Sequence, residues 1–143
     1  MTLAAAQVID ALAARLVPMP ATGGRVHTSR TWPLAEGDLP AWRVIAADEQ
    51  AERVSTDGLH VHTLTVEAKA YARAVADLDD ALHALASAGM ALLFAAPAPY
   101  SLQLAGIDRA TEGQGEAAVG AITLRLIATF YTYPAQPDTI VSA

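Results

Sequence analysis

Two histidines separated by one residue, His60 and His62, are the side chains in this chain best placed to hold a metal ion. In an extended segment, side chains two positions apart point to the same face of the strand. A metal site needs further ligands, and His27 or Asp57 would have to supply them. Two ligands alone do not define a site, so the pattern favours two strand residues near a loop over a metal centre.

Carboxylates gather at two other places in the sequence. Asp77, Asp79 and Asp80 could bind a divalent cation, but the ligand spacing of an EF-hand is missing, and capping of a helix explains the cluster better. Glu112 and Glu116 could act as an acid–base pair. The glycines between them leave their geometry free, so a solvated turn is the better interpretation.

The sequence lacks the motifs of common enzyme and cofactor sites. It contains no G-x-S-x-G, no H-E-x-x-H, no glycine loop leading into GK[ST] and no dinucleotide fingerprint. The absence of cysteine excludes disulfides, thiolate zinc sites and thiol nucleophiles. The glycines of Gly23-Gly24 and Gly113-Gln-Gly115 lack the strand-to-helix setting that phosphate binding needs. We therefore expect no enzyme activity, no metal and no other cofactor.

Composition indicates a folded chain of one domain, residues 1–143, because 53% of the residues are apolar and only 17% are charged. The formal net charge is −6, and the nine Lys and Arg residues are scattered along the sequence. This balance argues against a protein that neutralises phosphates or reads nucleic-acid sequence. Without basic neighbours, Trp32 and Trp42 are better explained as core or interface anchors than as base-stacking residues.

The first residues, MTLAAAQVIDALAARL, have no basic leader and contain Asp10 and Arg15, so they do not resemble a signal peptide. The apolar run from Met90 to Ala96 is too short to cross a bilayer. We expect a protein made and kept in the cytoplasm.

Hydrophobic periodicity predicts the secondary structure. Helical spacing predicts helices from Ala4 to Leu16 and from Val75 to Leu93. Alternation and β-propensity predict strands at Arg25–Trp32, Trp42–Ala47, His60–Tyr71, Leu102–Ile107 and Ile122–Phe130. The expected connections are a turn-rich loop at Pro33–Pro40, a polar stretch at Asp48–Asp57, a hairpin loop at Asp108–Glu116 and a mobile tail after Pro134, residues 134–143.

Runs of strands with two helices between them predict an α+β fold. We expect a small mixed or antiparallel sheet, two helices packed on one of its faces, and a C-terminal β-hairpin. The core is predicted to contain Leu12, Leu64, Val66, Leu78, Leu82, Leu124 and Leu126.

Three segments carry a resemblance to a known family. The first is the proline-led strand LPAWRVI, together with the acidic stretch and the alternating strand that follow it. The second is the second helix. The third is the acidic glycine hairpin that ends in IATFYTY. With the N-terminal helix before them, this order resembles the tail terminator proteins of long-tailed bacteriophages, the lambda-type minor tail protein U group. The resemblance covers about Thr2 to Tyr133 and rests on element order, without a single diagnostic motif.

The resemblance implies a structural virion protein, assembled in the host cytoplasm. It would form a homohexameric ring at the head-proximal end of the tail tube, stop tube polymerisation and present a surface for joining the head. Its partners would be itself, the tail tube protein and a head–tail connector or neck protein. DNA would pass through the channel without specific binding, and no membrane would be involved. Low positive charge suits such a channel.

Acidic glycine loops between strands are suitable contacts for neighbouring subunits or the tube. We therefore expect interface residues in two segments: Asp48, Glu49, Glu52 and Arg53 in the first, and Asp108, Arg109, Glu112 and Glu116 in the second. Two alternatives stay open. One is another neck or head-completion protein of the same junction, and the other is a small ligand-binding domain or an enzyme with a non-standard site.

Overall fold

The computed structural model describes residues 3–28, 40–74, 77–95, 97–112 and 118–141. Along the chain the elements are α1 (Ala4–Leu16), β1 (Val26–His27), β2 (Ala41–Arg53), β3 (His60–Ala74), α2 (Leu78–Leu93), β4 (Ser101–Glu112), β5 (Ala118–Tyr133) and β6 (Gln136–Val141). Two helices and a mostly antiparallel sheet confirm the predicted α+β class.

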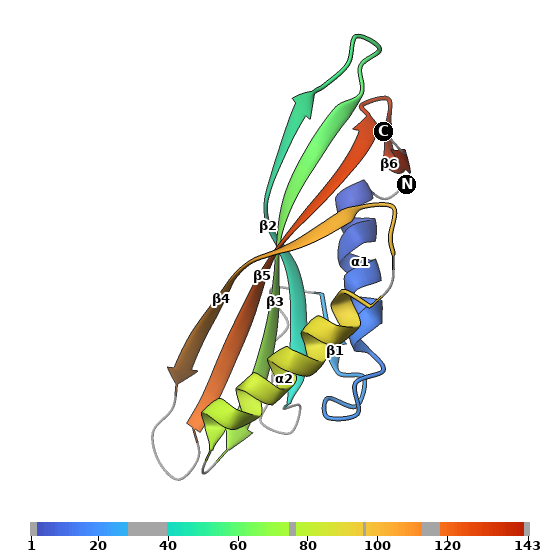
Figure 1. The fold of residues 1–143 in the computed structure, drawn as a ribbon. Helices are drawn as coiled ribbons and strands as arrows, with labels where there is room; N and C mark the ends of the chain where they lie inside the picture. Colours follow the sequence, from blue (N-terminus) through green and yellow to red (C-terminus); the bar gives the residue numbers. More distant parts are fainter. Residues whose placement is uncertain (1–2, 29–39, 75–76, 96, 113–117, 142–143) are drawn as a thin grey trace.

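The sheet of the described residues has the order β1-β2-β3-β5-β4, with β6 paired to β5 off this path. Only β1 runs parallel to its neighbour, and the other ladders are antiparallel. β3 and β5 lie at the centre, where their ladder runs from His60↔Thr132 to Ala74↔Ala118. Figure 1 shows the strong twist of these long strands, with both helices beside the sheet.

One face of the central strands supplies most of the core. The alternation of β5 holds as predicted, because Ile122, Leu124, Leu126, Ala128 and Phe130 are all buried. They form one cluster with inward residues of β2 and β3 and with the buried stripes of both helices. Of the seven predicted core residues six are buried, and Leu78 is partly buried against the cluster.

Each helix is fixed to the rest of the chain by specific contacts. Arg15 of α1 donates hydrogen bonds to the carbonyl oxygens of Leu93 at 2.6 Å and Pro97 at 3.2 Å, which satisfies a carbonyl at the end of α2. Trp42 of β2 is fully buried and donates its indole N–H to the Met19 sulfur at 3.3 Å. Trp42 is therefore a core anchor, while Trp32 lies outside the described residues.

β2 is longer than predicted. We expected it to end at Ala47, but it continues through the acidic segment to Arg53, which pairs with His60. The register shifts between Ala46 and Asp48, which is a β-bulge. The prediction was wrong because Asp and Glu have low strand propensity, whereas the ladder to β3 and an edge position open to solvent decide the conformation here.

β4 is also longer than predicted, and it removes part of the expected hairpin loop. The strand begins at Ser101 and pairs with β5 as far as Glu112↔Val119. Asp108, Arg109 and Glu112 are therefore strand residues and not loop residues. Those of their backbone groups that point toward β5 are paired with that strand, which the sequence pattern did not indicate. Glu116 lies outside the described residues.

The end of the described chain differs from the expected mobile tail. Gln136–Val141 forms β6, which pairs with Tyr131 and Tyr133 of β5. The β4 ladder starts at Thr129, so the last residues of β5 have an open side that β6 occupies. Gln7 of α1 also donates a hydrogen bond to the Asp138 carbonyl oxygen at 2.6 Å. Residues 142 and 143 lie outside the described residues.

The remaining differences concern element ends. Of the strand predicted over Arg25–Trp32, β1 contains Val26 and His27, and residues 29–39, with most of the predicted turn, are not described. β3 runs three residues past Tyr71 to Ala74. α2 begins at Leu78, after Asp77 with a φ of 57°, and residues 75 and 76 of the predicted helix are outside the description.

Candidate functional site

One hairpin of the sheet, which we call the β2–β3 arm, residues 47–63, is largely exposed. Figure 1 shows it extending from the rest of the molecule, with its turn at the top of the view. Every residue from 47 to 54 is exposed. Among the described residues, β1 pairs with β2 only at Trp42 and Arg43, so the outer edge of β2 along the arm has no strand beside it. Such an edge offers unpaired backbone groups to another chain.

The turn of the arm is fixed by its own side chains. Arg53 donates from Nε to the Ser55 carbonyl oxygen and from Nη2 to the Thr56 carbonyl oxygen, each at 2.9 Å. Gly58 has a φ of 95°, which a residue with a side chain rarely adopts. The predicted interface residue Arg53 is therefore used in holding the turn.

Asp57 ties this turn to β5. Its carboxylate accepts a hydrogen bond from the Ser55 hydroxyl and another, at 2.7 Å, from the Tyr133 hydroxyl. The bond from Ser55, followed by that from Tyr133, lowers the pKa of Asp57. The bond to Asp57 in turn raises the pKa of Tyr133.

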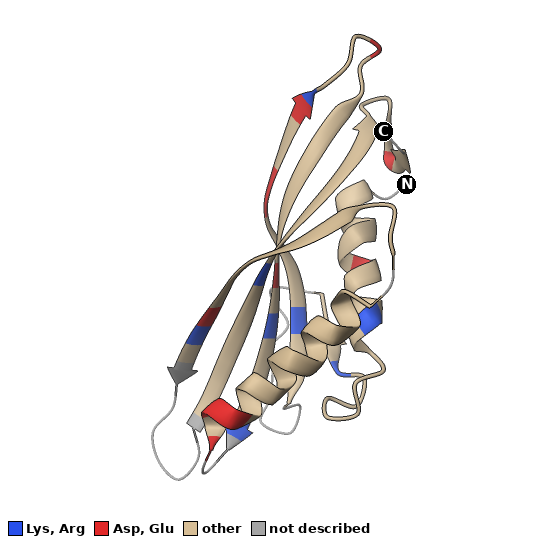
Figure 2. Ribbon diagram, viewed as in Figure 1, with Lys and Arg blue, Asp and Glu red and all other residues tan. Residues whose placement is uncertain are grey.

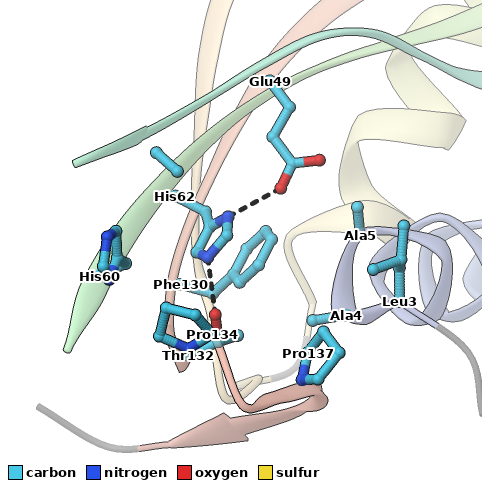
Figure 3. Close-up of a pocket in the computed structure, with 11 residues that line it drawn as sticks. Leu3, Ala4, Ala5, Glu49, His60, His62, Phe130, Thr132, Pro134 and Pro137 are labelled. Carbon is cyan, nitrogen blue, oxygen red and sulfur yellow. Dashed lines mark hydrogen bonds and ion pairs between the residues drawn. The ribbon is translucent and has the colours of Figure 1, made fainter. Parts of the chain in front are cut away.

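A polar network holds the base of the arm (Figure 3). The His62 Nδ1 lies 2.8 Å from a carboxylate oxygen of Glu49, and its Nε2 lies 2.6 Å from the Thr132 hydroxyl. A carboxylate only accepts, so Nδ1 carries the proton, and in the neutral ring Nε2 accepts from Thr132. The ring also stacks on Phe130, with centroids 4.8 Å apart and an interplanar angle of 5°. β2, β3 and β5 are thus joined at one imidazole.

Beside this network lies a cavity of about 210 Å³. Its walls come from the arm, from the start of α1 and from the β5–β6 region, and include Leu3, Ala4, Ala51, Phe130, Pro134 and Pro137. Figure 3 shows His62 and Phe130 side by side at this cavity. The lining is mostly apolar, and the polar groups of His62 that face it are already bonded, so the cavity suits a small apolar group.

The structure does not assemble the ligand set considered for His60 and His62. Both nitrogens of His62 are engaged, and the His60 Nδ1 lies 2.8 Å from the Gly58 carbonyl oxygen. His27 sits beside Arg43, at the other end of β2 from the arm. Asp57 is bonded to Ser55 and Tyr133. Across the described chain, no group of three or more His, Asp or Glu side chains is arranged around a common metal position.

The aspartates at the second helix lie at its N-terminal end, but the predicted capping hydrogen bond is not formed. Asp77 precedes α2 without a side-chain cap hydrogen bond, and Asp79 and Asp80 are exposed in its first turn. Their negative charge there favours the helix through its dipole. The pair Glu112 and Glu116 is not tested, because Glu116 is not among the described residues.

The two predicted interface segments are not brought together. Asp48, Glu49 and Glu52 lie on the arm, whereas Asp108 and Arg109 lie toward the other end of the sheet, on the opposite edge strand. Asp108 forms an ion pair with Arg125 of β5. Arg109 donates from Nε to the His83 Nε2 of α2 at 3.0 Å.

Sequence reasoning missed the partners of the arm. It did not foresee that Phe130, Thr132 and Tyr133 of β5 would contact His62 and Asp57. The only available signal was that Phe130 and Thr132 share a face of their strand, since pairing of strands distant in sequence leaves no local pattern.

Comparison with protein-family models and with curated proteins gives no match to this chain. In the described part of the chain, neither helix is long and apolar enough to span a membrane.

Proposed function

We propose that this chain is a structural subunit that forms a homohexameric ring at the head-proximal end of a phage tail tube. The ring stops tube polymerisation and offers its other side to the connector or neck protein during head joining. DNA passes through its channel without specific recognition. The protein would reside in the virion after assembly in the host cytoplasm, and it would act without a cofactor.

The observation that carries this proposal is the β2–β3 arm. It is an exposed acidic strand with an open edge, yet its turn and base are fixed by Arg53, Asp57 and His62. A rigid projecting edge loses little conformational freedom when a neighbour covers it. These are properties of a contact between subunits.

The fold gives further support. The tail terminator resemblance implies a small α+β fold. Two helices and a mostly antiparallel sheet agree with that class, and both helices share one core cluster with the sheet. The free edge of β4 in the described residues offers a second surface for a neighbour.

The cavity beside His62 favours the second candidate function, a small ligand-binding domain. Its volume of about 210 Å³ is below the roughly 300–1,000 Å³ of common ligand pockets. A ligand there would raise the melting temperature of the isolated protein. We rank this function second because the cavity is small and its polar groups are already bonded to one another.

Deletion of the gene tests the proposed function. Tube subunits stack head to tail and present the same face after each addition, so a tube without its terminator keeps growing. We expect unjoined heads together with tubes longer than normal, visible by electron microscopy. Tails of normal length that fail to attach would favour a head-completion protein, and normal infectious particles would refute both assignments.

A further inference from the structure

The face of the sheet opposite the core cluster carries an ordered pattern of charge, which we call the open face. Residues directly opposite one another on neighbouring strands form rows across this face. One row contains Arg43 of β2, Lys69 of β3, Thr123 of β5 and Asp108 of β4. Ile45, Glu67, Arg125 and Gly106 form the next row toward the arm. Figure 2 shows Lys and Arg on the lower halves of these strands and acidic residues on the upper part of β2. The scattered basic residues of the sequence are thus partly gathered on one surface.

Lys69 differs from Arg43 and Arg125, two other cations of this face. Arg125 pairs with Asp108 and lies directly opposite Glu67. The Arg43 guanidinium lies over the Tyr71 ring, 5.7 Å from its centroid. The Lys69 ammonium makes no ion pair or hydrogen bond with any described residue. The Lys69 ammonium is therefore available for a contact with another chain, on a protein whose net charge is −6.

Lys69 also borders a hollow of about 210 Å³ on this face. Small side chains make its floor, and it is lined by Lys69, Tyr71, Ala110, Val119, Gly120, Ala121 and Thr123. An ammonium and a hydroxyl beside a shallow apolar floor suit a carboxylate carried on a short aliphatic stem.

The arm carries carboxylates of this kind. The register places Asp48 opposite Thr65 and Glu52 opposite Val61, so both belong to the rows of the open face. Both are exposed, and neither has an ion pair within the described chain. Along β3 they lie about 13 Å and about 26 Å from the row of Lys69, at roughly 3.3 Å per residue. The hollow and the acidic arm cannot meet within one molecule.

We propose that the hollow beside Lys69 receives the acidic arm of a second copy of this chain, with Glu52 facing the Lys69 ammonium and Asp48 lying about 13 Å farther along the same face of the arm. The contact joins two different patches, so it closes a ring when the rotation between neighbouring copies divides a full turn. The proposed contact rests on the proposed function, which supplies the ring, and it names the two surfaces that meet in that ring. Because two copies repel each other through their net charge, local complementarity sets both the partner and the register.

Charge exchange tests the pairing. Lys69→Glu and the double variant Asp48→Lys/Glu52→Lys should each weaken self-association by about three- to tenfold in sedimentation velocity, and the combined variant should restore it. Asp10→Lys, at an exposed carboxylate on α1, is the control and should leave association unchanged. If the combined variant associates no better than the separate ones, the pairing is wrong.

Disulfide trapping tests the geometry, and the absence of native cysteine makes it specific. Glu52→Cys and Ala110→Cys lie ten residues apart along the β3 register, about 33 Å, so a disulfide between them must join two copies. Oxidation should give a ladder of cross-linked species up to the hexamer. The pair Asp10→Cys/Ala110→Cys should give none.

The outcomes separate this contact from the proposed function. Rings that form on tube ends without cross-linking between these cysteines overturn the contact and leave the terminator assignment standing. Cross-linked species that stop at the dimer support the contact and count against the ring. No cross-link at the highest soluble concentration of protein, and none on tube ends, overturns the contact.

Discussion

At the scale of single residues, the arm depends on polar contacts between side chains far apart in the sequence. Tyr133 donates to Asp57 across 76 positions, and His62 joins Thr132 across 70. The bonds that Asp57 accepts stabilise its ionised form, while the same contact with Tyr133 stabilises the protonated phenol. The contact between Tyr133 and Asp57 at the tip of the arm therefore requires a pH at which Asp57 is ionised and Tyr133 is protonated.

The sign of the pH dependence follows from the two shifts. The pKa of Asp57 is lowered in the folded state, so its contribution is complete above about pH 5 and is lost as the pH falls through that lowered pKa. The pKa of Tyr133 is raised, so its contribution is complete below about pH 9 and is lost as the pH rises through that raised pKa.

Tyr133→Phe should therefore lower the free energy of unfolding by a constant amount between about pH 5 and pH 9, with a smaller difference from the parent at either extreme. Urea unfolding over a pH series measures this difference, and the carboxyl resonance of Asp57 should titrate closer to its ordinary pKa. Tyr131→Phe, on the same face of β5, is the matched control. An equal pH dependence for the two variants would show that the Asp57 contact contributes nothing.

Core residues provide a second prediction at this scale. Leu82 is 1% exposed and Leu124 is fully buried, one on α2 and one on β5. Leu82→Ala and Leu124→Ala should each lower the free energy of unfolding by about 2–5 kcal/mol in denaturant titrations, since each leaves a cavity. Leu104→Ala, at a residue 38% exposed on the edge strand β4, should have a clearly smaller effect. Losses below about 0.5 kcal/mol at both buried sites would place them outside the core.

At the scale of elements, the close approach of α2 to β2 depends on one glycine. A Cβ added to Gly89 would lie 2.5 Å and 2.6 Å from Cζ2 and Cη2 of the Trp42 ring. Trp42 is fully buried and bonded to Met19, so it has little room to move. Glycine costs the helix about 1 kcal/mol relative to alanine, and its presence here is explained by this contact.

Gly89→Ala should therefore destabilise the protein by about 1–3 kcal/mol in spite of its better helix propensity, because the added methyl overpacks the site. Trp42→Phe removes the two ring atoms concerned. In that background Gly89→Ala should be neutral or stabilising, and a double-mutant cycle by thermal and denaturant unfolding measures the coupling. Additive effects of the two changes would mean that the helix does not pack on Trp42 as described.

At the scale of the whole molecule, a twisted sheet carries a rigid arm near one end and a free edge strand on the other side. Contacts between unlike surfaces of this kind close into rings when the rotation between neighbours divides a full turn. In the proposed assembly the ring has six members, and the tube end would act as its template.

Purified protein added to tail tube ends should therefore appear as a six-fold ring by electron microscopy, and tube growth should stop where the ring is bound. The solution mass of the isolated protein reports on the contact between copies and not on the symmetry of the ring, so the six-fold arrangement is examined on the tube end. Asp48→Lys/Glu52→Lys should bind tube ends less well than the parent, with Asp10→Lys as the control. A ring of different symmetry would count against the terminator assignment.

The sequence by itself determined the class of the fold, because burial of one face leaves a local period. The alternation in β5 and the stripe of α1 predicted which side chains are buried, and Val8, Leu12, Leu64 and Leu124 are fully or almost fully buried. Such patterns depend only on residues a few positions apart.

Only the tertiary structure decided where strands end and which distant side chains meet. Asp48–Arg53 has poor strand propensity, but β3 lies beside it and pairs with the backbone groups that face it, so β2 continues. The His62 network and the row of Arg43, Lys69 and Asp108 require ladders between strands far apart in the chain. Register between such strands is set by packing of the whole sheet, which no local pattern records.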